Sequence, residues 1–309
     1  MAIFYNKITD QKKLQRQYRL TVQTADENGI ETNEAIVLES EQHHLTIKFA
    51  INRTLFADIN SMDIDIYNLA PDTYNKLFYD YFNVNRRTII LEAGYKGQEM
   101  STIFIGDVWN CFTERQGSDI ITRIHALVGL KSLQAQTDVT LHNITRDKIL
   151  YKAADDMALD IEIYSGEDTQ FSRDVSLSGN SMGIIQQYSD NNAFIDNNVI
   201  KVLNDKDAIK GNVVLINDEA GLLGVPKRED AILKVTMIFE PRIVIGQIIE
   251  IKSRIMPQFD GQYKVYGLKH EGTISDSIAG TCTTTLEMLV GSQIYGRFDV
   301  KNKHQQKLN

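Results

Sequence analysis

The chain has 309 residues, 42% of them apolar and 24% charged, which is ordinary composition for a globular protein of two or three domains. Its formal net charge of −8 argues against a protein that clamps nucleic acid by the phosphates. The two cysteines, Cys111 and Cys282, lie far apart in no metal-binding frame, so they predict a reducing compartment and no disulfide framework or zinc site. No signal region or membrane span is recognisable.

Apolar and polar residues alternate in the first block, from Tyr18 to about Ala126. Alternation with period two predicts strands that bury one face, as in antiparallel sheets and barrels. A helix is expected near residues 74–81, with Pro71 in or just before its first turn. We therefore predict that residues 1–132 form a β-barrel or sandwich that includes one helix. Its strands are predicted near residues 18–22, 45–51, 63–69, 88–93, 102–108 and 120–126.

The period changes after about Leu133. Residues 145–159 place apolar side chains at helical spacing, and a second, shorter helix is predicted over residues 182–189. Asparagines at positions 191, 192, 197 and 198 predict turns before a strand over residues 199–203. Residues 133–198 hold 4 basic and 11 acidic side chains, which is nearly all of the net acidity. We predict an α+β middle region over residues 133–198.

Alternation with period two returns in the third block, with strands predicted near residues 233–239, 263–268 and 282–288. The last residues, 296–309, are polar and basic and are expected to form a tail. The fold class predicted from periodicity is therefore mainly β with an α+β insertion. Its segments are residues 1–132, 133–198 and 199–309, the first and third being barrel-like.

The sharpest match to a catalytic motif is Gly179-Asn180-Ser181-Met182-Gly183, which fits the G-x-S-x-G nucleophile elbow. The elbow needs a buried apolar strand directly before it, but the run over residues 171–176 is polar. We therefore interpret the motif as a small-residue helix start. The six histidines show no metal-ligand spacing, and the adjacent Asp155 and Asp156 point apart on a helix. We therefore predict that the protein is not an enzyme and that it has no catalytic residue, no cofactor site and no metal site.

Several short motifs follow one another in a recognisable order over residues 18–290. Signature positions of the first block are Gly94, Tyr95 and Gly106. Signature positions of the third block are Gly221, Gly224, Pro226, Pro241, Gly246, Tyr263, His270 and Gly272. In this order the motifs resemble those of phage baseplate hub proteins, a family related to the bases of type VI secretion spikes.

The resemblance implies two tail-tube-like antiparallel β-barrels per chain and a trimeric hub that joins the hexameric tail tube to the trimeric spike. The implied partners are further copies of this chain, the tail tube protein, the spike protein and other baseplate proteins. DNA would pass through the lumen without specific binding, which an acidic wall favours because it repels phosphate. The implied location is the tail baseplate of the virion, after synthesis in the cytoplasm of the bacterial host.

Two other functions stay open. A tail tube subunit or tube initiator needs only one barrel, and the second β block argues against it. A cell-wall hydrolase needs a carboxylate pair or a triad, which we do not find in the sequence.

Overall fold

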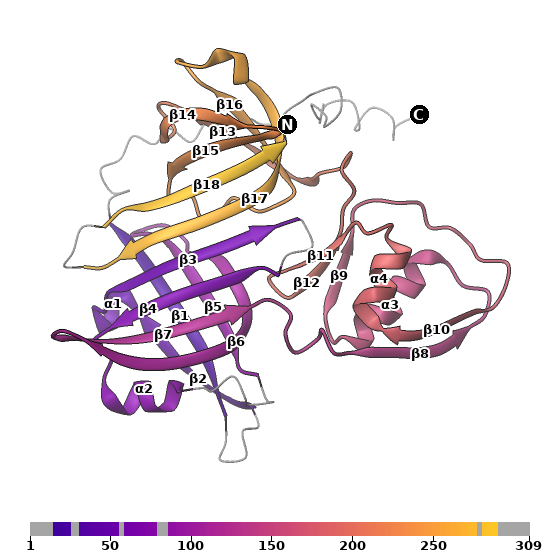
Figure 1. Cartoon of the computed structure of the whole chain (residues 1–309), viewed down its shortest axis with the longest axis horizontal. Coiled ribbons are helices and arrows are strands. Elements are labelled where there is room, and N and C mark those ends of the chain that lie inside the picture. Colours follow the sequence, from indigo (N-terminus) through magenta and orange to yellow (C-terminus); the bar gives the residue numbers. More distant parts are fainter. Residues whose placement is uncertain (1–14, 26–30, 56–58, 79–85, 277–279, 290–309) are drawn as a thin grey trace.

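The computed structural model describes residues 15–25, 31–55, 59–78, 86–276 and 280–289. It is mainly β, with a small helical body beside the β strands (Figure 1). The elements of the first block are β1 (Arg16–Ala25), β2 (Glu31–Glu39), α1 (Ser40–His43), β3 (Ile47–Thr54), β4 (Ser61–Tyr67), α2 (Pro71–Leu77), β5 (Thr88–Tyr95), β6 (Ser101–Gln116) and β7 (Asp119–Leu127).

The middle region contains β8 (Gln136–Leu141), α3 (Arg146–Asp156), β9 (Asp160–Ile163), β10 (Val175–Asn180), α4 (Ser181–Tyr188), β11 (Ala193–Asp196) and β12 (Val199–Val202). The third block contains β13 (Ile209–Asn217), β14 (Leu222–Glu229), β15 (Ile232–Ile238), β16 (Gln247–Lys252), a 3-10 turn η2 (Pro257–Phe259), β17 (Gly261–Ile274) and β18 (Cys282–Leu289). The predicted α+β insertion in a mainly β chain is confirmed.

One hydrogen-bonded sheet runs through both β blocks, in the order β2-β1-β5-β6-β7-β4-β3-β17-β18-β15-β14. The blocks meet where β3 pairs antiparallel with β17, from Ile47 opposite Ile274 to Thr54 opposite Gly267. Strand β16 joins β17, and β13 joins β16 in parallel. Among the described strands, no pairing links the two ends of this path. The sheet is therefore continuous and, over the described residues, open, where two tail-tube-like antiparallel β-barrels were expected.

The two β blocks repeat one topology. Strands β3 to β7 pair in the order β5-β6-β7-β4-β3, and strands β14 to β18 pair in the matching order β16-β17-β18-β15-β14. The long central strand has a bulge in each copy, next to Val108 in β6 and next to Val265 in β17. Each central strand pairs with the shorter preceding strand before its bulge and with the following strand after it. We call the two five-stranded units the first and the second repeat.

When the two central strands are aligned at their bulges, a polar cross-strand pair of the first repeat corresponds to one of the second repeat. Thr113 in β6 then corresponds to His270 in β17, and Thr122 in β7 corresponds to Thr284 in β18. The Thr113 and Thr122 hydroxyls lie 3.0 Å apart, and Nδ1 of His270 lies 2.9 Å from Oγ1 of Thr284. Thr122 and Thr284 are both fully buried. The two repeats thus share a cross-strand contact as well as a strand order.

Three apolar cores follow the three blocks of the sequence. In β3, Ile47, Phe49 and Ile51 are buried while Lys48 and Asn52 are exposed, as alternation with period two requires. The first and third cores lie beneath the first and second repeats, and the core of the middle region lies between α3, α4 and its small sheets. The predicted middle helices correspond to α3 and α4. Helix α2 ends at Leu77, and Tyr81 of the predicted helix lies outside the described residues.

Candidate functional site

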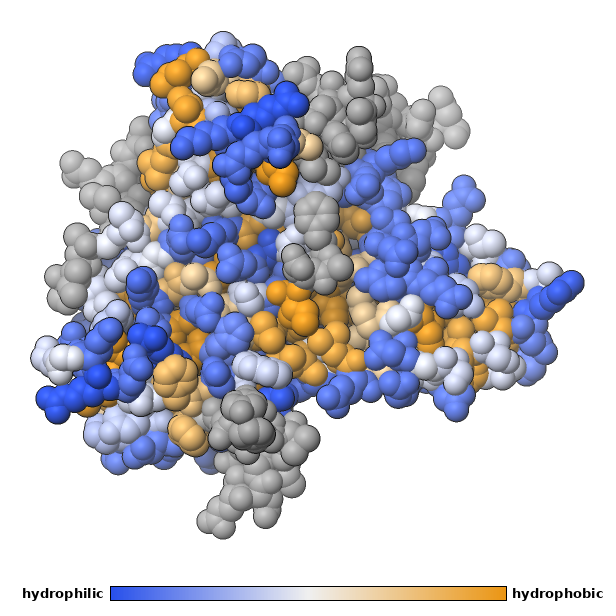
Figure 2. Space-filling view, viewed as in Figure 1, coloured by the Kyte–Doolittle hydropathy of each residue, from blue (hydrophilic) through white to orange (hydrophobic). Residues whose placement is uncertain are grey.

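The two repeats share one side of the sheet, which points away from the cores and runs over strands β6, β7, β4, β3, β17, β18 and β15. We name this surface the sheet face. Figure 2 shows hydrophilic residues over most of the front of the molecule and a hydrophobic group between the first block and the middle region. The side chains of the sheet face are Phe112, Glu114, Arg123, His125, Asp63, Asp65, Lys48, Ala50, Asn52, Lys269, Glu271, Thr273, Thr283, Thr285, Glu287, Lys234 and Thr236.

Opposite charges pair on the sheet face, both between neighbouring strands and along one strand. Arg123 lies 2.9 Å from Glu114 and 3.6 Å from Asp65, and burial raises the pKa of Asp65 against the opposing effect of the Arg123 charge. Lys269 pairs with Glu271 at 2.5 Å, Lys234 with Glu287 at 3.2 Å, and His125 with Asp63 at 2.7 Å.

Over the described residues, the sheet face carries five carboxylates and four lysines or arginines. Three of these four cations contact a carboxylate, so the described part of the face contains no unbroken basic stripe. A surface of this kind offers little continuous positive potential to a polyanion.

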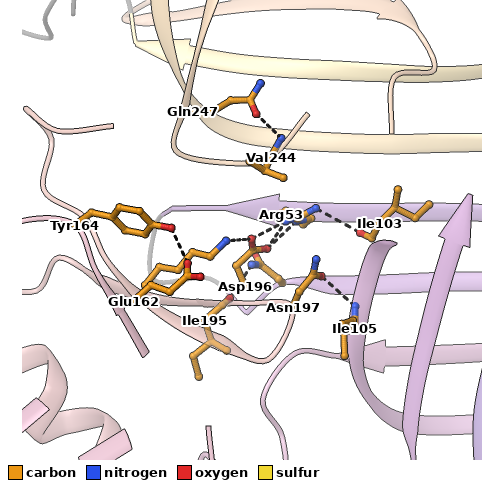
Figure 3. Close-up of polar contacts among 12 residues, drawn as sticks. Arg53, Ile103, Ile105, Glu162, Tyr164, Ile195, Asp196, Asn197, Val244 and Gln247 are labelled. Atoms are coloured by element: carbon orange, nitrogen blue, oxygen red, sulfur yellow. Dashed lines mark hydrogen bonds and ion pairs between the residues drawn. The ribbon is translucent and has the colours of Figure 1, made fainter. Parts of the chain in front are cut away.

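A buried charge cluster fixes the middle region to the first repeat (Figure 3). Arg53 of β3 donates from Nε and Nη2 to the carboxylate of Asp196 in β11, at 2.8 and 2.6 Å. Lys201 of β12 donates to the same carboxylate at 3.0 Å. Burial opposes ionisation of Asp196, but the charges of Arg53 and Lys201 outweigh it and hold the pKa of Asp196 below its usual range.

The turn between β11 and β12 docks on the first block by side-chain amides. Asn197 and Asn198 have φ angles of 50° and 58°, which asparagine tolerates in a two-residue hairpin turn. Oδ1 of Asn197 accepts a hydrogen bond from the backbone N–H of Ile105 at 3.0 Å, and Oδ1 of Asn198 accepts one from Gly129 at 3.3 Å. The turn predicted from these asparagines is confirmed, and it is a contact between blocks.

Phe239 contacts both Tyr95 and His270 at the junction of the two repeats. The Tyr95 hydroxyl donates to the carbonyl oxygen of Phe239 at 2.6 Å, and the Phe239 ring lies edge-on to the His270 ring at 5.4 Å. Burial raises the pKa of Tyr95 to about 12. Burial and the nearby Arg53 charge lower the pKa of His270 to about 3, so this histidine is neutral.

The other signature positions are distributed along the sheet. Gly272 approaches the neighbouring strand so closely that an added Cβ would lie 2.5 Å from Cα of Cys282. Gly246 has φ of 84°, and its Cβ would lie 2.7 Å from Cδ2 of Leu203. The remaining positions lie in β5 (Gly94), β6 (Gly106), beside or in β14 (Gly221, Gly224 and Pro226), in the turn before β16 (Pro241) and in β17 (Tyr263). These residues build strands and turns and do not converge on one pocket.

Ser181 lies at the start of α4 and is completely buried, with its Oγ 2.9 Å from Oγ1 of Thr137. Asn180 caps the helix, because its Oδ1 accepts a hydrogen bond from the Gly183 N–H at 3.0 Å. Among the described strands, the strand before it, β10, pairs with β8 alone in a two-stranded sheet. The motif is therefore a capped helix start, and its serine is not exposed as an elbow requires.

The buried cluster was missed by the motif search, although the sequence carries a signal for it. Alternation through Ile47, Phe49 and Ile51 places Arg53 on the buried face of the same strand. An arginine at a buried strand position needs a carboxylate partner. Nothing in the sequence alone identifies that partner as Asp196.

The described residues contain no group of three or more histidine, cysteine, aspartate or glutamate side chains arranged to hold a metal ion. No helix in the described part of the chain is long and apolar enough to cross a membrane.

Comparison with known proteins places this fold among tail proteins. The sequence profile of a family described as Baseplate hub gp41 matches residues 21–277. No curated protein matches the sequence. Among solved structures, the 43 kDa tail protein of prophage MuSo2 from Shewanella oneidensis has a TM-score of 0.56 at 8% identity, covering 87% of this chain and 96% of its own.

Two further solved structures are similar to this chain. An Escherichia coli component of the type VI secretion system, described as similar to phage T4 tail proteins, has a TM-score of 0.54 at 10% identity. It covers 81% of this chain and 75% of its own. A chain of the Francisella PdpA–VgrG complex has a TM-score of 0.55 at 9% identity, covering 94% of this chain and 55% of its own. At these identities the likeness shows the fold alone.

Proposed function

The chain belongs to the Baseplate hub gp41 family, and from this premise we propose that three copies of it form a closed ring between a hexameric tail tube and a trimeric spike. As a family member it is a structural protein of a tail baseplate, of the phage or type VI secretion kind. The ring encloses part of the channel through which DNA leaves the particle. The proposed partners are other copies of this chain, the tube protein, the spike protein and neighbouring baseplate proteins.

The repeated topology carries this proposal. Each chain holds two equivalent five-stranded units, joined edge to edge by the β3–β17 ladder. Three chains therefore present six similar units to a hexameric tube and still match the threefold symmetry of a spike. A tube subunit needs only one such unit, so the duplication favours a hub over a tube subunit or tube initiator.

The sheet face suits the wall of a DNA channel. Duplex DNA carries one phosphate per roughly 1.7 Å of axis, so an unpaired row of lysines would bind it strongly. On the sheet face the cations alternate with carboxylates and most are paired, which leaves a slight acidic excess. We propose that this face lines the lumen and that DNA passes it without specific binding.

The middle region, residues 133–198, is proposed as a separate segment that faces other baseplate proteins. It has its own apolar core and carries most of the net acidity of the chain. Residues 1–132 and 199–309 are proposed as the two ring-forming segments. We propose no catalytic role for any residue, since Ser181 is buried and the signature residues build the sheet.

Counting the copies in assembled particles tests this proposal. An averaged electron-microscopy image of the baseplate is expected to show one ring of three chains with pseudo-sixfold inner symmetry. Native mass spectrometry of a disassembled baseplate is expected to give the mass of three chains. Six copies per ring, or single isolated copies in intact tails, would contradict the hub and favour a tube subunit.

A further inference from the structure

Two edges of the sheet are open at opposite ends of one run of strands, β14-β15-β18-β17-β3-β4-β7-β6 (Figure 1). At one end, β14 pairs with β15 alone among the described strands. At the other end, residues 107–116 of β6 pair with β7, while β5 pairs with the earlier residues 101–107. No described strand pairs with the far side of Asn110–Gln116.

The chain already contains a template for covering such an edge. In the second repeat, the half of β17 that follows the bulge pairs with β18 on one side and with β3 on the other. In the pairing order, strand β3 stands at the end of the first repeat, and β14 stands at the corresponding end of the second repeat. The corresponding half of β6 pairs with β7 on one side, and none of the described strands pairs with its other side as β3 pairs with β17.

We propose that β14 of one copy pairs antiparallel with the second half of β6 in the next copy, as β3 pairs with β17 inside each chain. This inference rests on the proposed trimer and identifies the edges that close it. The contact is head to tail, so each copy uses each of these two edges once. Such a heterologous contact forms a ring when the rotation between copies closes.

The internal template also fixes the register. Aligning the repeats by their bulges makes Glu114 equivalent to Glu271, and Lys227 equivalent to Ala50. Glu271 lies opposite Ala50 in the internal ladder, so Glu114 of one copy faces Lys227 of the next. This register follows from the positions of the bulges alone, and it places opposite charges next to each other.

Two further features of these edges agree with the proposed pairing. Phe112 in β6 is 41% exposed and Leu223 in β14 is 42% exposed, so each open edge carries a large apolar side chain that a neighbouring strand would cover. The β14 register shifts between Leu223 and Lys227, where Gly224 and Pro226 lie. The regular part of the proposed ladder is therefore short, from Lys227 to Glu229 against Glu114 to Phe112.

Cysteine cross-linking in assembled tails tests the proposed register. With Glu114→Cys and Lys227→Cys in the same chain, mild oxidation is expected to link the copies into a covalent trimer on a non-reducing gel. The reason is that opposed residues in a ladder lie within disulfide reach. Ala50→Cys with Glu271→Cys is the matched internal control, which is expected to close within each chain. The native Cys111 and Cys282 are buried.

A second control shows whether the cross-link requires directly opposed residues. Lys234 lies opposite Lys227 on the next strand, so Glu114→Cys with Lys234→Cys places the thiols about 10 Å apart and is expected to give no trimer band. Particles with three copies per ring, a closed internal control and no link between positions 114 and 227 would overturn the proposed pairing and leave the hub intact. Six copies per ring would instead overturn the hub.

Discussion

Arg53 and Asp196 form a two-point ion pair between the first β block and the middle region, and both side chains are almost completely buried. Arg53 also lies close enough to His270 to lower the pKa of that histidine. One arginine therefore influences both the docking of the middle region and the charge state of the repeat junction. A buried pair of this kind adds little net stability, but breaking it is costly.

Replacing Asp196 is expected to destabilise the protein strongly. Asp196→Asn leaves Arg53 and Lys201 buried without a counter-charge, which costs about 3–5 kcal/mol in comparable buried pairs. Urea unfolding monitored by circular dichroism measures the free energy of unfolding. The matched control is Asp63→Asn, which breaks a surface contact with His125 and is expected to cost less than about 1 kcal/mol. Equal losses in the two variants would refute a special role for the buried cluster.

His270 is expected to make the protein less stable in mild acid. Its pKa is about 3 in the folded chain, against about 6.5 when unfolded, so the unfolded chain binds the extra proton between these values. The free energy of unfolding therefore falls as the pH drops from 6.5 towards 3, by up to about 1.4 kcal/mol per pH unit. Asp196, with its lowered pKa, contributes a further loss only in stronger acid, below about pH 4.

The contribution of His270 is measured by urea unfolding at a series of pH values from 4.5 to 7. In His270→Gln the slope over this range is expected to become shallower, because no buried imidazole has to stay neutral. His142→Gln, at an exposed histidine, is the control and is expected to keep the slope of the unmodified chain. If His270→Gln and the unmodified chain show the same slope, the assignment is wrong.

Replacement by alanine is expected to have opposite effects on stability at two glycines, Gly272 and Gly183. At Gly272 an added Cβ would press on the backbone of Cys282 and Thr281, so Gly272→Ala is expected to lower the melting temperature by several degrees. Gly183 lies in α4, where the nearest atoms to an added Cβ are 3.9 Å away. Gly183→Ala is therefore expected to stabilise by about 0.5–1 kcal/mol. Scanning calorimetry of the two variants measures both effects.

Sequence periodicity predicted the strands that bury one face, because alternate side chains of a strand point to opposite faces and the buried ones are apolar. The strands near Tyr18, Leu45, Leu233 and Cys282 are present, as are α3 and α4. Strands β8 and β10 escaped prediction because they form a small separate sheet with few buried residues. Parallel pairing of β9 with β12, and of β13 with β16, was also missed, since short runs do not specify their partners.

The features on which the proposed assembly rests depend on contacts between distant residues. The β3–β17 ladder joins positions more than 200 residues apart, and periodicity says only that both strands bury one face. The repeat was hidden because the two units share a strand order and a polar pair, Thr113–Thr122 and His270–Thr284, whose residue types differ. The signature positions identified the family, but their placement in strands and turns required the structure.

Ser181 is expected to be dispensable for any chemistry. Its hydroxyl is buried against Thr137, so Ser181→Ala loses one internal hydrogen bond and is expected to cost about 1 kcal/mol. Tails carrying Ser181→Ala are expected to assemble and infect normally. Treatment of the unmodified chain with a serine-directed phosphonate, followed by peptide mass spectrometry, is expected to leave this residue unlabelled. Labelling at Ser181 alone would reopen the hydrolase alternative.

Charge on the sheet face is expected to control how freely DNA moves through the ring. If this face lines the lumen, Asp and Glu outnumber Lys and Arg along the wall, and Glu271 stands at the ladder between the repeats. Glu271→Lys removes a carboxylate and leaves Lys269 unpaired, and the ring repeats the change in every copy.

Each such position then presents adjacent cations to passing phosphates. Their attraction is expected to slow DNA release at low salt, and added salt is expected to restore the rate because it screens the contact. Fluorescence of a dye that binds released DNA measures the rate in assembled particles at several salt concentrations. Glu167→Lys is the matched control on the exposed surface of the middle region, and it is expected to leave the rate unchanged. Slowing by both variants alike, or by neither, would count against the sheet face as the channel wall, as would an imaged lumen lined mainly by lysine and arginine.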